Sequence, residues 1–238
     1  MYKALASFIV VLAISVTQLF SQISKLNLSY GIGTSSSLGT FRSVDFDNDK
    51  AGFAGSGLST ALNIDYKFKN GNLGASLGIH NQNNSFKTDD YETELQRNLI
   101  GLNDANVYAG LYQRTSFMIG LNYVYPVNDK SYLTFRLMGG ATIGKLPEEE
   151  GFLYGSNNLW YVQPAAYATS PGFSIGGNFR TPLSKKINLN AECNYSASSY
   201  EFTNVASYYS TGDISTYTRN ISMTSLQLLL GISVDLIR

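Results

Sequence analysis

The 238-residue sequence has little cysteine, histidine or charge. One Cys and one His exclude intrachain disulfides and Cys-based zinc clusters. Charged residues make up 14% of the chain, compared with about 25% in an ordinary soluble domain. Hydrophobic residues make up 44%, which is too high for intrinsic disorder. The 17 basic and 17 acidic residues also lack the basic excess of a nucleic-acid-binding protein.

Long hydrophobic runs are missing, apart from one near the N-terminus. This run follows Lys3 and covers residues 4–16, which is short of the roughly 20 residues of a membrane-spanning helix. It predicts a cleavable signal peptide over residues 1–22, with a buried N-terminal strand or helix as the alternative. Residues 23–238 show no internal repeat or linker, so we expect one further domain.

Glycine, aromatic residues and strict alternation are what the sequence has in abundance. It contains 22 Gly and 13% aromatic residues, a composition that favours strands and close backbone approaches. From Leu26 onward, apolar side chains recur at every second position, which predicts β-strands. We count eight such segments, at residues 26–33, 58–68, 73–80, 116–125, 133–138, 173–180, 187–195 and 226–236.

The connections between these segments alternate in length. Three are short turns with the Gly, Asn, Asp and Pro residues typical of hairpins. Four others are long, and we expect them to be loops. Short turns at one end and long loops at the other are typical of an up-and-down antiparallel transmembrane β-barrel, whose closure removes exposed sheet edges. The turns lie at 69–72, 126–131 and 183–186, and the long segments at 39–53, 88–106, 146–170 and 203–219.

The polar face of the strands indicates which face of the barrel points outward. A soluble barrel, the alternative, would expose a face rich in Lys, Glu and Thr. Here the polar positions are mostly Gly, Ser and Asn, which suit a narrow lumen filled by side chains. We therefore predict that the apolar face contacts lipid, with an aromatic girdle near the short turns. The girdle residues are Tyr66, Phe68, Tyr123, Tyr125, Tyr132 and Phe179.

The eight-strand pattern, with glycine-rich strands such as Leu73-Gly74-Ala75-Ser76-Leu77-Gly78, resembles the small outer-membrane barrels of the OmpA transmembrane-domain and OmpX type. This resemblance covers about residues 24–238. It implies a location in the outer membrane of a Gram-negative cell envelope, with long loops outside the cell and short turns in the periplasm. It also implies contacts with outer-membrane lipids and the barrel-assembly machinery. Such barrels end their last strand in an aromatic residue, whereas this chain ends Leu236-Ile237-Arg238.

Three charged residues on the polar faces of neighbouring strands are expected at similar height in the lumen. They are Arg136, Arg180 and Glu192. Because an unpaired charge is costly in a low-dielectric lumen, we predict an Arg–Glu–Arg cluster that plugs the barrel, joined by Asp65 or Asp235. A gated proton or ion path is the alternative role for this cluster.

His80, the single histidine, is predicted to point into the lumen. Residues 81–85 after it show no arrangement of nucleophile and orienting acid. We therefore predict no catalytic residue and no enzymatic activity, with a lumen hydrogen bond as the role of His80. Cys193 falls on the lipid-facing side of its strand and is expected to act as a small hydrophobe.

The first long segment partly resembles a calcium-binding loop. The resemblance begins at Asp45, where acidic residues alternate along the chain. However, Lys50 occupies the position that needs Gly, and Ser56 occupies the position that needs a bidentate Glu. We predict no metal and no cofactor, with weak cation binding as the alternative.

The third long segment contains the single Trp. Phe152, Trp160 and Tyr161 are candidates for binding, because exposed aromatic residues on long loops are frequent contact sites. We predict an integral outer-membrane barrel with a structural or surface-interaction role and an extracellular or envelope protein partner. The alternatives are a transport or secretion accessory and, on weaker grounds, a lipid-modifying enzyme.

Charge is distributed unevenly along the chain. The four long segments contain 12 acidic and 4 basic residues, a net charge of −8. The overall neutrality therefore results from an acidic loop end and a basic remainder.

Overall fold

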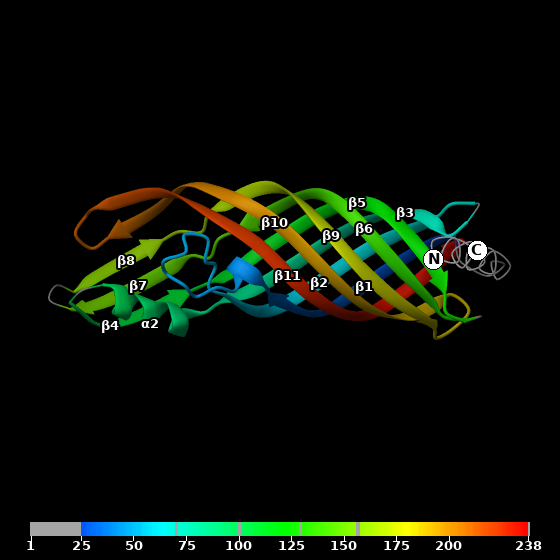
Figure 1. Ribbon diagram of the computed structural model, residues 1–238, viewed down its shortest axis with the longest axis horizontal. Coiled ribbons are helices and arrows are strands. Elements are labelled where there is room, and N and C mark those ends of the chain that lie inside the picture. Colours follow the sequence, from blue (N-terminus) through cyan, green and yellow to red (C-terminus); the bar gives the residue numbers. More distant parts are fainter. Residues whose placement is uncertain (1–24, 70, 100, 129, 156–157, 238) are drawn as a thin grey trace, which may run out of the picture.

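The computed structural model describes residues 25–237, apart from 70, 100, 129, 156 and 157, and the expected signal peptide lies outside the described residues. Within them, antiparallel β-sheet dominates (Figure 1). The elements are β1 Leu26–Ser37, η1 Gly39–Phe41, β2 Ala54–Lys67, β3 Leu73–Phe86, α2 Thr88–Asn98, β4 Leu102–Ala109, β5 Leu111–Pro126, β6 Tyr132–Lys145, β7 Glu149–Gly155, β8 Leu159–Gln163, β9 Tyr167–Pro182, β10 Ile187–Tyr209 and β11 Ile214–Ile237.

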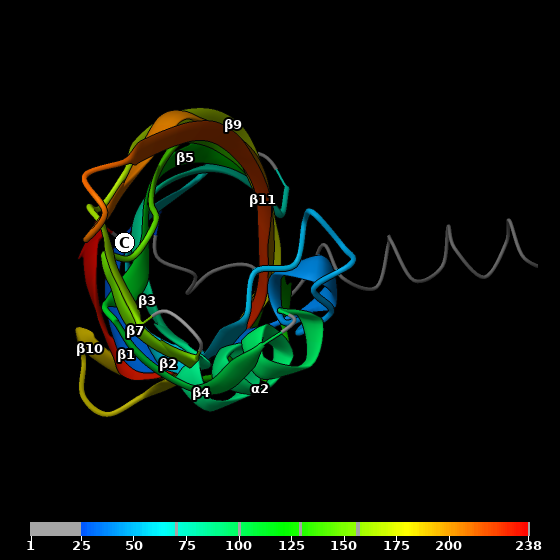
Figure 2. The same ribbon diagram turned by 90° about the vertical axis from the view of Figure 1, so that its left-hand side faces the viewer.

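Eight of these strands close into a ring. Their order is β1-β2-β3-β5-β6-β9-β10-β11, and β11 pairs back with β1. Every pairing around the ring is antiparallel, and the view along the axis shows the closed outline (Figure 2). The expected eight-stranded up-and-down barrel is confirmed.

The two ends of the ring differ, as the sequence predicts. The β2–β3, β5–β6 and β9–β10 turns lie at one end, called here the short-turn end. The start of β1 and the end of β11 lie on the same side (Figure 1). The remaining connections lie at the opposite, long-connection end.

The long segments themselves are more ordered than we expected from the sequence. Residues 88–106 contain α2 and the start of β4, and residues 146–170 contain β7 and β8. Residues 203–219 are largely the outer parts of β10 and β11, joined by the turn 210–213. The alternation there places small polar residues inside and aromatic residues outside, for example buried Ser207 beside exposed Tyr208. The register of β10 against β11 also shifts between Phe202 and Val205, so the period-two pattern of the inner strand does not continue into this segment.

The added strands extend the barrel wall at the long-connection end. β4, β7 and β8 form a sheet with β10 in the order β10-β8-β7-β4, and α2 packs beside β4 (Figure 1). We call these elements, together with the outer ends of β10 and β11, the extension. No helix in the described part of the chain is long and apolar enough to span a membrane.

The apolar strand faces point outward and the polar faces point into the lumen. On β5, Phe117, Ile119 and Leu121 are 49%, 65% and 59% exposed, whereas the alternate residues Ser116 and Asn122 are buried. The outward apolar positions of β5 continue to Tyr125, and about nine residues is the length of a tilted membrane-spanning strand. The lipid-facing assignment follows from this pattern.

Small residues make room for polar neighbours in the lumen. A Cβ at Gly176 would lie 1.9 Å from the Asn194 Oδ1 atom, so only glycine fits there. The lumen is therefore filled by side chains that point inward from the wall.

Candidate functional site

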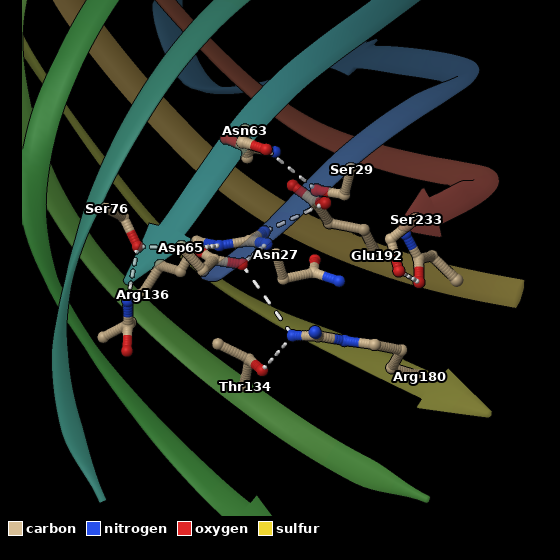
Figure 3. Close-up of polar contacts among 12 residues, drawn as sticks. Asn27, Ser29, Asn63, Asp65, Ser76, Thr134, Arg136, Arg180, Glu192 and Ser233 are labelled. Atoms are coloured by element: carbon tan, nitrogen blue, oxygen red, sulfur yellow. Dashed lines mark hydrogen bonds and ion pairs between the residues drawn. The ribbon is translucent and has the colours of Figure 1, made fainter. Parts of the chain in front are cut away.

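The lumen near the short-turn end contains an ion-pair network (Figure 3). Arg136 on β6 binds Asp65 on β2 through two bonds, with Nε–Oδ1 at 3.0 Å and Nη2–Oδ2 at 2.7 Å. Its Nη1 atom lies 3.0 Å from Oε2 of Glu192 on β10. Because β2, β6 and β10 are not adjacent in the ring, these bonds link separate parts of the wall across the lumen. Two-pronged Arg–carboxylate pairs are among the stronger polar contacts in proteins.

Arg180 on β9 joins the network more loosely. Its Nη2 atom lies 3.8 Å from Asp65 Oδ2 and donates to Thr134 Oγ1 at 3.1 Å. Its Nη1 atom lies 3.8 Å from Asp235 Oδ1. The structure thus brings all five charged residues named from the sequence together, but around Asp65. Glu192 pairs with Arg136, so the shared acid is Asp65 and not Glu192 as in the expected Arg–Glu–Arg arrangement.

A third arginine, Arg114 on β5, lies farther from the short-turn end of the lumen and was missed from the sequence. It is 3% exposed and donates to the Met223 carbonyl at 2.7 Å, to Ser225 Oγ at 3.0 Å, and to Gln82 and Ser196. All of these partners are neutral. Arg114 precedes the predicted strand by two residues on its polar side, so extending that strand by one inward position would have found it.

His80 points into the lumen, as the alternation predicts. It is buried, and its Nε2 atom lies 2.8 Å from Oδ1 of Asn63 on the neighbouring strand β2. Within the described part of the chain, His80 makes no hydrogen bond to a Ser, Thr or Cys side chain that it could activate as a nucleophile. The geometry around His80 is that of a hydrogen-bonded lumen residue.

A cluster of aromatic and aliphatic residues fills the lumen between Arg114 and the long-connection end. It combines side chains from β2, β3, β5, β10 and β11 with Phe41 of η1 and the segment that follows it. The ring centroids of Phe41 and Tyr112 lie 5.1 Å apart, and those of Phe86 and Tyr112 lie 6.0 Å apart. We call this cluster the apolar plug. Its buried members are Phe41, Ala51, Phe53, Ala54, Phe86, Tyr112, Leu146, Tyr200, Phe202, Val205, Ile221 and Met223.

Inside the extension, an ion pair connects β7 to β11. Glu149 Oε1 lies 3.2 Å from Arg219 Nη1, and Glu149 is 3% exposed. Burial raises the pKa of Glu149 above its ordinary value, although the positive charge of Arg219 opposes the rise. Tyr217 on β11 also donates to Gln163 on β8. Polar bonds therefore brace the interior of the extension between strands that are not neighbours.

The aromatic residues expected to bind a partner are divided between the two sides of the extension sheet. Phe152 and Trp160 lie on its outer face, with ring centroids 6.4 Å apart, and Trp160 Nε1 donates to Glu150 Oε1 at 3.0 Å. Tyr161 points to the inner side, where it is buried beside Tyr209. Alternation within β8 causes this separation.

The outer face of the extension sheet carries further aromatic residues. Tyr108 on β4, Tyr154 on β7 and Tyr208 on β10 are 66%, 41% and 45% exposed. Strand pairing sets Tyr108, Glu150, Val162 and Tyr208 in one row across the four strands. We call Tyr108, Phe152, Tyr154, Trp160 and Tyr208 the aromatic face.

The first long connection has the geometry of polar turns. The Asp47 backbone N–H donates to Asp45 Oδ1 at 3.1 Å, and the Lys50 N–H donates to Asn48 Oδ1 at 3.0 Å. Among the described residues, no group of three or more His, Cys, Asp or Glu side chains is arranged to hold a metal ion. Cys193 lies exposed on the apolar outer wall, the side expected from the sequence.

A closed antiparallel ring with an apolar outer belt and a filled polar lumen defines an integral outer-membrane β-barrel protein. No protein-family model and no curated protein matches the chain. Among solved structures, it is similar to the outer membrane protease OmpT from Escherichia coli, with 10% identity, a TM-score of 0.50, and coverage of 91% of this chain and 99% of that one.

Two further solved structures are similar at comparable identity. One is a major outer membrane protein from Thermus thermophilus, with 12% identity, a TM-score of 0.49, and coverage of 88% of this chain and 98% of that one. The other is Neisserial surface protein A, with 10% identity, a TM-score of 0.45, and coverage of 89% and 97%. The likeness to OmpT concerns the fold alone, and together with the closed ring it confirms the expected outer-membrane barrel class at that level.

Proposed function

We propose that this protein is a surface-interaction protein, in which the barrel is the membrane anchor and the extension is the contact module. In this proposal the long-connection end faces the outside of the cell and the short turns face the periplasm. The aromatic face is the contact surface, and it binds an extracellular or envelope protein. Outer-membrane lipids surround the apolar belt, and the barrel-assembly machinery inserts the chain.

The observation that carries this proposal is the contrast between a filled lumen and an exposed aromatic sheet. Along the lumen, the Asp65–Arg136–Glu192 network, the Arg114 layer and the apolar plug follow one another. A polar solute would have to cross both a salt-bridged layer and an apolar one. This arrangement favours an anchor over a transport or secretion accessory. Exposed aromatic patches, in contrast, commonly mark interaction sites.

His80 supports a non-enzymatic role, since its hydrogen-bond partner is the Asn63 amide. OmpT is named a protease, but 10% identity extends only to the fold. We therefore expect no hydrolytic activity in this barrel.

Two measurements test the proposal. In planar bilayers, the wild-type protein should show no large, steady conductance, and a stable open channel would contradict the anchor role. For contact, cells displaying the double variant Tyr108→Ala/Trp160→Ala should lose most binding to envelope or host-surface protein extracts. The control is Tyr167→Ala, because Tyr167 is 68% exposed on β9, away from the aromatic face. Equal binding by both variants would remove the aromatic face as the contact surface.

A further inference from the structure

A surface hollow of about 750 Å³ lies between the first long connection and α2. Its walls come from the segment that follows β1 and from α2 with the residue before it. The polar and charged lining residues are Arg42, Ser43 and Asp45 on one side and Lys87, Glu94 and Arg97 on the other.

The hollow concentrates positive charge in an acidic part of the molecule. The long segments carry a net charge of −8. Six basic residues lie in or directly beside these segments, and three of them, Arg42, Lys87 and Arg97, line this one hollow. Within the acidic long-connection end, this hollow is therefore the expected binding position for an anion.

The acidic side chains of the hollow are already occupied. Asp45 Oδ1 accepts the Asp47 backbone N–H at 3.1 Å. Glu94 pairs through Oε1 with Arg97, and its Oε2 accepts Asn98 Nδ2 at 3.3 Å. The charge of Glu94 is thus offset by Arg97, whereas Asp45 keeps its negative charge and accepts a hydrogen bond only from a backbone N–H.

Arg42 has donors to spare. Its guanidinium makes no ion pair or hydrogen bond with any residue in the described part of the chain, whereas its backbone carbonyl accepts Lys87 Nζ at 3.4 Å. That bond holds the Lys87 ammonium beside Arg42. Lys87 also pairs with Asp90 at 3.4 Å, but both side chains are partly exposed, and such surface pairs contribute little. The Arg42 guanidinium is thus unpaired within the described part of the chain and Lys87 is only weakly paired, whereas Arg97 is paired with Glu94.

We propose that this hollow binds a phosphate monoester. A phosphate monoester carries up to two negative charges and three acceptor oxygens, so it can bind Arg42 and Lys87 together, which a single carboxylate matches less well. The planar fork of Arg42 fits two phosphate oxygens, and Lys87 acts as a point charge.

The phosphate could belong to a dissolved molecule or to a membrane lipid. Lys87 directly follows β3, whose outward apolar positions end at Ile79. The hollow therefore lies beyond the lipid belt on the side of the long connections, where headgroups and solutes both have access. This site is separate from the aromatic face and does not depend on it.

The test compares two variants that remove one positive charge from the same connection. Arg42→Gln removes the free guanidinium, whereas Lys50→Gln removes a cation that does not line the hollow. Calorimetry on folded, detergent-solubilised protein with glucose 1-phosphate tests the dissolved source, with glucose as the uncharged control. Amide exchange over residues 39–45 and 87–97 in phosphatidylcholine nanodiscs, with and without monophosphoryl lipid A, tests the lipid source.

In at least one arm, we expect binding that Arg42→Gln weakens about tenfold or more, because the charge-assisted hydrogen bonds between the guanidinium and the phosphate are lost. Lys50→Gln should change it less than about twofold, as expected for a screened surface charge. The arm that responds identifies the source of the phosphate. The proposal is overturned if neither probe binds, if glucose binds as well as its phosphate, or if the two variants behave alike.

Discussion

The two ends of the lumen are both filled by side chains, but one end is filled by charged groups and the other by apolar groups. Near the short turns, five charged side chains fill the space, centred on Asp65 and Arg136. Near the long connections, the apolar plug fills it with rings and aliphatic groups such as Phe202 and Met223. Three strands, β2, β10 and β11, contribute inward-facing residues to both sets. An inward position must therefore be filled, and its neighbours decide whether the filling is polar.

Among the described residues, two of the three buried lumen arginines sharpen this contrast. Arg136 has carboxylate partners on two sides, whereas Arg114 donates to a carbonyl, an amide and two hydroxyls. Removing Arg136 leaves the buried carboxylates of Asp65 and Glu192 without their main cationic partner. Removing Arg114 leaves only neutral acceptors, which tolerate the loss better.

The largest effect is expected for Arg136→Met. It should lower the free energy of unfolding by about 3–5 kcal/mol, because Asp65 and Glu192 remain buried without their main partner. Urea titration of the barrel in lipid vesicles measures this value. Arg114→Met should have a smaller effect, about 1–3 kcal/mol, from unsatisfied neutral groups.

A second variant tests the reason for that loss. Adding Glu192→Gln to Arg136→Met removes one unpaired buried charge and should restore part of the free energy of unfolding. The explanation by unpaired buried charge would be wrong in either of two cases. In the first, Arg114→Met lowers the free energy of unfolding as much as Arg136→Met does. In the second, adding Glu192→Gln to Arg136→Met restores none of that free energy.

At the opposite end, Phe202→Ala probes the apolar plug. Phe202 is 1% exposed and packs against Tyr200 with ring centroids 5.7 Å apart. Its truncation should lower the free energy of unfolding by about 3 kcal/mol, through lost burial and the cavity left behind. The same urea titration applies. The matched control is Phe173→Ala on the lipid-facing wall, where Phe173 is 47% exposed, and a similar loss there would show that the plug is not tightly packed.

The ring could be predicted because its wall obeys a simple rule. Residues such as Phe117 to Tyr125 alternate between lipid and lumen without interruption, so strand number, order and facing all follow from the sequence. The extension could not be predicted in this way. Its outward positions mix Tyr108 and Tyr208 with the charged Glu150 in one row across the sheet, so no uninterrupted apolar alternation marks its strands.

The lumen site was predictable in membership but not in detail. The alternation of facing and the position along each strand place Arg136, Arg180 and Glu192 together. They do not reveal which acidic residue contacts both arginines. That depends on side-chain reach across the ring, which makes Asp65 the common partner. The apolar plug was hidden for a different reason, because Phe41 and Phe53 reach it from the first long connection, whose path the alternation does not describe.

The smallest expected effect concerns the extension and depends on pH. Burial raises the pKa of Glu149 from its ordinary value of 4.5, so the folded extension binds this proton more tightly than the unfolded chain does. The stability contributed by protonation is complete below pH 4.5 and is lost as the pH rises through the raised pKa. The local free energy of opening, measured by amide exchange on β7, should therefore fall from pH 4.5 upward in the wild type.

Glu149→Gln should flatten this pH dependence, because the amide does not titrate. The matched control is Glu150→Gln, the next residue on β7, which lies on the outer face and accepts a hydrogen bond from Trp160 at 3.0 Å. This control should keep the wild-type slope. If both variants kept it, the buried carboxylate of Glu149 would not be its source, and the bond to Arg219 would brace the extension without making it sensitive to pH.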